Sequence, residues 1–378
     1  MKIPIAKPWL NESEAQNAYD VVLSGWVTQG PQVEKFEELT AKFCGAKYAI
    51  AVSNCTVALE LSLIAAGVKP GDEVICPSMS FIATANCVVN IGATPIFAEV
   101  NKDFNLDIHD VKNKITSKTK AIILVHQIGL PGDIDAFSEL CTEKKLTLIE
   151  DAACAIGSRY KGRKIGSHSN FVCFSYHPRK IITTGDGGMI LTNDEAVAEQ
   201  LRLLRQHGMS INDNLRHKAK NIIFEEYLLI GRNCRMTDIQ AAIGIAQMLK
   251  LPEIIAKRRS IALRYNESFR SIEGLILPRF EDEYFSNFQS YSLLLTDKAI
   301  IKRNELMNLL LSKGIATRRG VVCSHLEKAY LNHFDKQVHL PKSEFYSLNS
   351  IIIPLYPTMT NEEVSYVCSE VRRLLTSV

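Results

Sequence analysis

The sequence predicts an α/β protein with two domains, and three observations support this fold class. At 378 residues, the chain is too long for one typical hydrophobic core and about right for two. Continuous apolar runs alternate with amphipathic stretches through the first two thirds, which is typical of a mostly parallel sheet between helices. The last third has strand-like runs and a terminal amphipathic helix. We therefore expect a large domain with an N-terminal arm, residues 1–248, and a smaller C-terminal α+β domain, residues 249–378.

The expected elements follow in order from local patterns. Apolar runs predict strands at 48–52, 73–76, 95–100, 121–125, 146–149 and 171–175. Helical patterns predict helices at 57–66, 85–90 and 134–145, and Gly67 and Gly92 follow the first two as stop signals. A long helical pattern from about 237 to 264 leads into the second domain. There we expect strands at 291–296 and 351–357 and a helix at 361–375.

Composition excludes several classes of function. A net charge of +3 and 46% hydrophobic residues indicate a soluble globular protein, and no run of lysine and arginine suits a nucleic acid. No apolar window is long enough to cross a membrane, and the N-terminus lacks the apolar core of a signal peptide. The ten cysteines include no CxxC pair and lie partly in apolar runs, so we expect reduced core residues and no metal site. We expect a cytoplasmic protein without membrane or nucleic-acid partners.

The usual nucleotide motifs are absent, but another phosphate site is possible. No GxGxxG follows the early strands, and the nearest approach to a P-loop, residues 157–164, has Arg163 in the lysine position. Small polar residues 53–56 lie between a strand and a helix. Free backbone N–H groups and the helix dipole could bind phosphate there, although an ordinary helix cap would look the same.

A lysine and two acids are expected at one edge of the sheet. Glu150 and Asp151 end a buried strand, and Lys180 follows the strand at 171–175 by a few residues. An acid, a lysine and a phosphate-binding helix end suit pyridoxal phosphate (PLP), because the amine can form a Schiff base and the carboxylate can keep the pyridine nitrogen protonated. The glycines after Lys180 would let the backbone pass close to the ligand. A solvated lysine and a capping acid remain the alternative interpretation.

Ordered motifs over nearly the whole chain resemble one family. They include "SGWVTQGPQVEKFE", "AVSNCTVALELSL", "IEDAACAIGSRYKGRKIGS", "FVCFSYHPRKIITTGDGGMILTND" and "GRNCRMTDIQAAIGIAQM". These stretches resemble the DegT/StrS-type sugar aminotransferases, which are PLP enzymes of fold type I, and look closest to perosamine synthases. The resemblance implies the fold-type I aminotransferase architecture, PLP as cofactor, and a homodimer with composite active sites.

The resemblance also implies roles for individual residues. Lys180 matches the catalytic Schiff-base lysine, and Asp151 matches the acid on the pyridine nitrogen. Cys154 stands where many members have Gln or His near the ring hydroxyl, and a thiol is a weaker hydrogen-bond partner than either. The remaining cofactor residues implied are Cys55, Thr56 and Ser175 at the phosphate, Phe81 stacked on the ring, and Asn233 reaching the phosphate from the neighbouring subunit. The implied substrate contacts are Trp26, Thr28, His177, Arg318, Arg319 and His325, although surface charge is an equal interpretation of the two arginines.

The resemblance implies transfer of an amino group from L-glutamate to a keto sugar. The family mostly aminates nucleotide-linked 4-keto or 3-keto hexoses for cell-surface polysaccharide and lipopolysaccharide. Some relatives act on other keto sugars, including an 8-oxo form of 3-deoxy-octulosonate. Dehydration or epimerisation on the same fold and a non-catalytic regulator are the other readings. Lys180 favours transamination, because related dehydratases carry histidine at that position.

Overall fold

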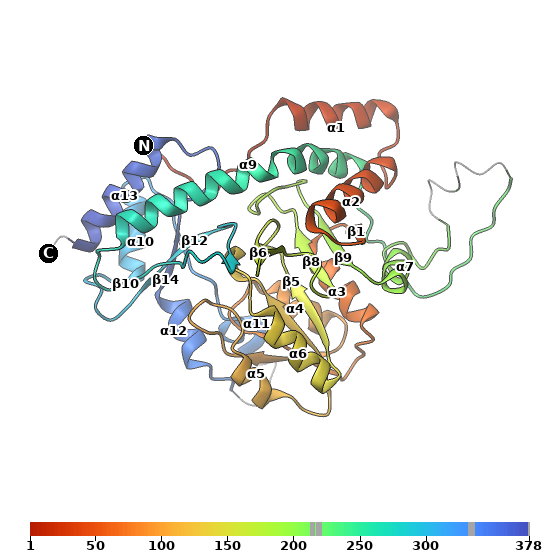
Figure 1. The fold of residues 1–378 in the computed structure, drawn as a ribbon, viewed down its shortest axis with the longest axis horizontal. Helices are drawn as coiled ribbons and strands as arrows, with labels where there is room; N and C mark the ends of the chain where they lie inside the picture. The colour runs from red at the N-terminus through yellow and green to blue at the C-terminus, as the bar shows by residue number, and fades with distance from the viewer. Residues whose placement is uncertain (212–215, 217–220, 332–336, 377–378) are drawn as a thin grey trace.

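A seven-stranded sheet forms the centre of the first domain (Figure 1). The computed structural model describes residues 1–211, 216, 221–331 and 337–376. The strand order is β1 (Tyr48–Val52), β9 (Gly188–Thr192), β8 (Val172–Ser175), β5 (Thr147–Asp151), β4 (Thr119–Val125), β2 (Glu73–Pro77) and β3 (Thr94–Ala98). β9 runs antiparallel to both of its neighbours, and the other pairs are parallel. The predicted α/β fold with a mostly parallel sheet is confirmed.

Helices cover both faces of this sheet. One face packs against α2 (Pro31–Cys44), α5 (Ile108–Lys114), α6 (Ile134–Lys144) and the first half of α9 (Asp238–Phe269). The other face packs against α3 (Cys55–Ala65), α4 (Ala83–Asn90) and α7 (Glu195–Leu204). Successive side chains of β4 alternate between the two cores, with Ile122 in the first and Ile123 in the second. Burial on both faces explains why this strand is apolar throughout.

The long helix α9 belongs to both domains. Thr237 and Gln240 form a capping box at its start. Leu251 packs in the core of the sheet domain, while Tyr265 and Phe269 pack in the core of the second domain. The boundary predicted after residue 248 therefore falls inside one continuous helix. Among the described residues, α9 is the helix long and apolar enough to cross a membrane, but over half of its most apolar window is buried in the protein.

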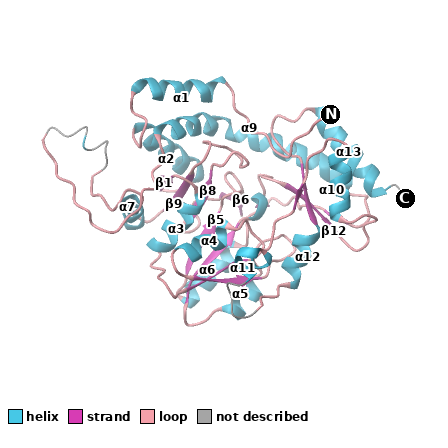
Figure 2. Ribbon diagram, turned by 180° about the vertical axis from the view of Figure 1, so that it is seen from behind, coloured by secondary structure: helices cyan, strands magenta, loops and turns pink. Residues whose placement is uncertain are grey.

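An antiparallel sheet and several helices form the second domain (Figure 2). The strand order is β10 (Leu275–Ile276), β12 (Tyr291–Leu295), β14 (Ser350–Ile353) and β13 (Arg318–Arg319). The helices are α10 (Arg303–Ser312), α11 (Lys328–Leu331), α12 (Pro341–Asn349) and α13 (Asn361–Thr376), with the short 3-10 turn η2 (Ser324–Leu326). A small sheet of β11 (Tyr284–Phe285), β6 (Arg159–Tyr160) and β7 (Arg163–Lys164) joins the two domains.

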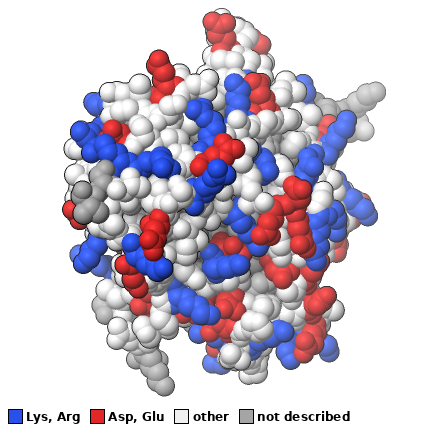
Figure 3. Space-filling model, turned by 60° about the vertical axis from the view of Figure 1, so that its left-hand side comes forward, with Lys and Arg blue, Asp and Glu red and all other residues white. Residues whose placement is uncertain are grey.

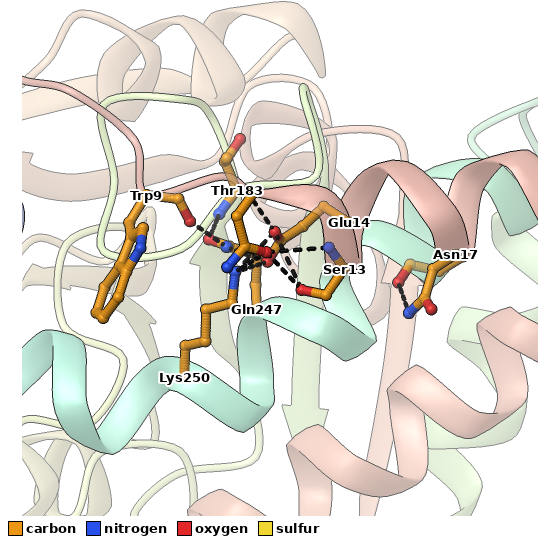
Figure 4. Close-up of polar contacts among 9 residues, drawn as sticks. Trp9, Ser13, Glu14, Asn17, Thr183, Gln247 and Lys250 are labelled. Atoms are coloured by element: carbon orange, nitrogen blue, oxygen red, sulfur yellow. Dashed lines mark hydrogen bonds and ion pairs between the residues drawn. The ribbon is translucent and has the colours of Figure 1, made fainter.

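The N-terminal arm is tied to the loop that follows Lys180. Helix α1 (Glu12–Ser24) lies along α9, and the Glu14 carboxylate accepts hydrogen bonds from Gln247 at 2.7 Å and Lys250 at 2.7 Å (Figure 4). The Gln247 side chain in turn accepts a hydrogen bond from the Thr183 backbone N–H at 3.3 Å. Since Glu14 and Gln247 are both buried, this network fixes the position of the loop against α9.

Candidate active site

A cavity of about 790 Å³ opens where β5 and β8 end, with contributions from both domains. Asp151 and Ser175, the last residues of these strands, line it together with the start of α3 and the loop after β8. Residues 289–290 and 318–322 close it from the second domain. The predicted site residues that line the cavity are Cys55, Thr56, Phe81, Asp151, Cys154, Ser175, His177, Lys180, Arg318 and Arg319.

Asp151 provides a buried carboxylate at the base of the cavity. Its side chain accepts a hydrogen bond from the Thr84 hydroxyl at 2.8 Å and from the Ala153 backbone N–H at 3.2 Å. Ser80 is hydrogen bonded to the Thr84 hydroxyl at 2.8 Å. Because the Thr84 proton points to Asp151, Ser80 is the donor in that second bond. The hydroxyl chain holds the carboxylate in one orientation at the base of the cavity.

Among the residues that the structure describes, Lys180 is the one lysine that lines this cavity. Its Nζ lies 3.2 Å from Cys154 Sγ. Burial by itself would lower the pKa of Lys180, but the Cys154 sulfur, with smaller contributions from Cys55 and Asp151, raises that pKa above its ordinary value. The amine is therefore directed into the cavity and lies within the electrostatic reach of the buried carboxylate.

The start of α3 forms a cradle for an anion. Asn54 caps the helix by accepting a hydrogen bond from the Val57 N–H at 3.0 Å, and Cys55 and Thr56 open the first turn beside the cavity. Their backbone N–H groups lie in the turn that has no intrahelical acceptors, at the positive end of the helix dipole. A Cβ built on Gly188 would lie 2.4 Å from the Asn54 carbonyl oxygen. Gly188 is therefore required for close packing against this turn, and the approach of the GDGG backbone to a ligand stays a prediction.

Two further side chains shape the interior of the cavity. Phe81 is 66% exposed although it is a large aromatic residue, and its ring forms part of the cavity wall. Cys154 is held through its backbone, because the buried Asn287 side chain donates hydrogen bonds to the carbonyl oxygens of Cys154 and Ile156, each at 2.9 Å. A second-domain residue thus fixes the segment that carries Cys154.

Positive charge gathers at the mouth of the cavity. Arg179, Arg318 and Arg319 line it, and Arg319 forms an ion pair with Glu327 at 3.2 Å. His177 also lines the cavity, and burial, followed by Arg179, lowers its pKa, so the ring is neutral at pH 7. On the face drawn in Figure 3, by contrast, basic and acidic side chains of the described residues are interspersed.

Four predicted site residues do not line the cavity. His325 is 4% exposed, and its ring nitrogens contact Ser78 Oγ at 2.6 Å and Glu344 Oε1 at 3.2 Å, so it is a structural residue here and not the expected substrate contact. Trp26 donates a hydrogen bond from Nε1 to the Gln29 carbonyl oxygen at 3.3 Å, in the loop that also carries the exposed Thr28. Asn233 is exposed on the segment between α7 and α9.

Glu150 points away from the predicted site. Its side chain is fully buried on the opposite face of the sheet from Asp151 and lies 2.8 Å from His126 Nε2. The Nδ1 of His126 accepts a hydrogen bond from the Gly132 N–H at 3.1 Å, so Nε2 carries the proton that Glu150 accepts. Two neighbouring residues of a strand face opposite sides of the sheet, and only one of the two acids can reach the cavity.

Sequence reasoning missed several residues of this site, and three of them show why. Thr84 holds Asp151, Asn287 holds the Cys154 segment, and Arg179 stands at the mouth. Arg179 could have been found because it is the immediate neighbour of Lys180 in the sequence. Thr84 and Asn287 are 67 and 133 residues from the groups that they bind, so no local pattern indicates them.

The residues present fit PLP. The helix turn and Ser175 offer donors for a phosphate, Phe81 offers an open aromatic face, Asp151 offers an anion for a protonated ring nitrogen, and Lys180 offers an amine for an aldehyde. Within the described ranges, no group of three or more His, Cys, Asp or Glu side chains is arranged to bind a metal ion. The fold and the cavity together define a PLP-dependent aminotransferase of fold type I.

The chain belongs to the DegT/DnrJ/EryC1/StrS aminotransferase family, whose model matches residues 8–372. It is 35% identical to the spore coat polysaccharide biosynthesis protein SpsC of Bacillus subtilis, over 99% of this chain and 97% of that protein. It is 34% identical to GDP-perosamine synthase of Escherichia coli O157:H7, over 98% and 97% of the two chains. The PLP form of Spr1654 from Streptococcus pneumoniae has the same fold, with a TM-score of 0.91, 27% identity and full coverage of both chains. The protein is a PLP-dependent sugar aminotransferase, and the predicted family, fold, enzyme class and cofactor are confirmed.

Proposed function

We propose that the chain transfers the amino group of L-glutamate to a nucleotide-linked keto hexose, at a 3-keto or 4-keto position, in the synthesis of a cell-surface polysaccharide such as lipopolysaccharide. The observation that carries this proposal is the placement of Lys180 and the buried Asp151 in one cavity with arginines at its mouth. The relatives named for spore coat polysaccharide and for perosamine support a sugar acceptor. We also infer a cytoplasmic location, because all ten cysteines are free.

Each predicted cofactor residue of the cavity has a proposed role. PLP supplies an aldehyde and a ring that accepts an electron pair from the substrate carbon. Lys180 Nζ holds the cofactor and then moves the proton at the reacting carbon, and Asp151 keeps a proton on the ring nitrogen. The backbone of Cys55 and Thr56 and the Ser175 hydroxyl bind the phosphate. We further assign ring stacking to Phe81 and a weak thiol contact near the ring to Cys154.

We propose that the working form is a homodimer in which Asn233 reaches the neighbouring active site. The described parts of the segment between α7 and α9 project from the body of the molecule (Figure 1). In its described part, Ile222, Phe224 and Ile230 are 86%, 84% and 98% exposed. Apolar side chains exposed to this extent on a projecting segment suit burial against a second copy of the chain. We extend the same proposal to Trp26 and Thr28, which would contact substrate only from such an interface.

The acceptor is tested with a panel of keto sugars and keto-sugar acids, offered with ¹⁵N-labelled L-glutamate and analysed by mass spectrometry. We expect one ¹⁵N-amino sugar and one equivalent of 2-oxoglutarate, and neither product with K180A. Borohydride reduction should add the mass of the cofactor at Lys180. Dehydration or epimerisation would give no stoichiometric 2-oxoglutarate, and robust turnover by K180A would refute the assignment of the catalytic lysine.

A keto-sugar acid without a nucleotide, such as an 8-oxo-3-deoxy-octulosonate, is the second candidate acceptor. The arginines at the mouth suit the carboxylate of such an acid as well as the diphosphate of a nucleotide sugar, because a guanidinium group binds either anion through two parallel hydrogen bonds. The same panel separates the two candidates, since it contains both compound classes.

A further inference from the structure

Two arginines at the mouth of the cavity have no acidic partner. Arg319 is paired with Glu327, but no carboxylate among the described residues forms an ion pair or hydrogen bond with the guanidinium groups of Arg179 and Arg318. Arg179 comes from the sheet domain, one residue before Lys180, and Arg318 comes from β13 of the second domain. Like charges that approach each other from two domains are repelled unless an anion lies between them.

The same two arginines line a second, smaller space. Nine residues border a cavity of about 50 Å³. Five of them also line the large cavity, namely Arg179, Gln289, Ser290, Arg318 and Ile352, and the other four are the apolar residues Ile5, Ala6, Ile353 and Leu355. The small space is therefore a side extension of the large one, and both arginines stand where the two meet. An extension of this size can take a single oxyanion group, whereas the large cavity has room for the cofactor and a sugar.

The backbone of this extension is held in place. Gln289 donates a hydrogen bond from Nε2 to the Arg179 carbonyl oxygen at 2.8 Å, and its own backbone N–H donates to the buried Asn287 side chain at 2.9 Å. A residue of the domain that carries Arg318 therefore fixes the backbone of Arg179. Partial desolvation lowers the pKa of the Arg318 guanidinium, and the charge of Arg179 contributes in the same direction. The two guanidinium groups are therefore preorganised to bind an anion that the described residues do not supply.

We propose that Arg179 and Arg318 form an oxyanion subsite of the cavity, which binds a carboxylate or phosphate group of a substrate. The proposal rests on the proposed function and deepens it, because it names the group by which a substrate is held outside the reacting centre. One source of the anion is the side-chain or α-carboxylate of the amino donor, and the other is the diphosphate or carboxylate of the sugar. In both cases the guanidinium groups accept no proton and act by charge and by paired N–H donors.

The test measures binding of two unreactive probes to the holoenzyme by titration calorimetry. Glutarate represents the donor, and inorganic pyrophosphate represents a nucleotide-linked sugar. We expect R179Q and R318Q each to weaken the affected probe about tenfold, the usual effect of losing one charge-assisted contact. R179K should retain part of the affinity, and R270Q, at the exposed end of α9, should bind both probes as the wild type does.

Every outcome decides the proposal. A loss confined to glutarate assigns the subsite to the donor, a loss confined to pyrophosphate assigns it to the sugar, and a loss of both assigns it to the two substrates in turn. Unchanged binding of both probes in R179Q and R318Q overturns the subsite. Because both arginines are exposed, the variants should fold, and an unaltered cofactor absorbance verifies this. The proposed function is judged separately by turnover of the wild type with labelled glutamate, so the two can fail independently.

Discussion

The Thr84 hydroxyl gives the sharpest test of how the carboxylate of Asp151 is held. T84V keeps the shape of this buried side chain but removes the donor that lies 2.8 Å from Asp151, leaving the Ala153 N–H at 3.2 Å as the remaining donor. A hydrogen bond to a charged group contributes about 1.5–3 kcal/mol, which corresponds to about a 10- to 150-fold change if it is fully expressed in binding or rate. Ser80 also loses its acceptor.

We expect T84V to weaken PLP binding and to lower kcat within that range, because the anion that holds the proton of the ring nitrogen is less well supported. T84S, which keeps the hydroxyl, is the matched control and should stay close to the wild type. The assays are titration of the apoenzyme with PLP, followed by absorbance, and steady-state turnover with L-glutamate. If T84V and T84S both match the wild type, the hydroxyl chain does not support Asp151 and the reasoning is wrong.

Three other predictions follow from contacts in the structure. G188A would bring a Cβ to 2.4 Å from a backbone carbonyl oxygen in the α3 turn, and it should weaken PLP binding about tenfold or more. G185A meets open space but has φ +90°, so it should lower the free energy of unfolding by only about 1 kcal/mol. PLP titration and melting curves compare the two variants. Burial by itself would raise the pKa of Glu14, but its hydrogen bonds to Lys250 and Gln247 hold that pKa below 4.5. The charged Glu14 side chain therefore stabilises the fold above pH 4.5, and this stabilisation is lost as the pH falls through the pKa of Glu14 in the folded protein. E14Q should therefore lower the free energy of unfolding by about 1–3 kcal/mol at pH 7 and by less in acid, and urea titrations that give one constant difference would contradict this. N287L removes both donors to the Cys154 segment and should lower the melting temperature and shift the absorbance of bound PLP, and an unchanged spectrum would show that Asn287 acts on stability alone.

Local pattern was sufficient for six of the seven strands of the main sheet. The apolar run at 121–125 became part of β4 because a strand buried on both faces has no polar position, and the helix at 134–145 became α6 because its periodicity is strong. Predicted boundaries differ from the observed ones by up to five residues, and capping decides several of them. Asn54, for example, caps α3, so the helix begins at Cys55 rather than at Val57.

The sequence by itself predicted the chemistry of this protein, since a helix start, a carboxylate and an amine follow the ends of β1, β5 and β8, and the ends of parallel strands lie at one edge of the sheet. Tertiary structure alone decided which of two adjacent acids faces the cavity, because the neighbours of Glu150 and Asp151 lie on opposite faces of the sheet. It also buried His325 between Ser78 and Glu344 and brought Arg318 beside Arg179. These contacts join residues that are far apart along the chain, and packing against the whole core, rather than local periodicity, selects them.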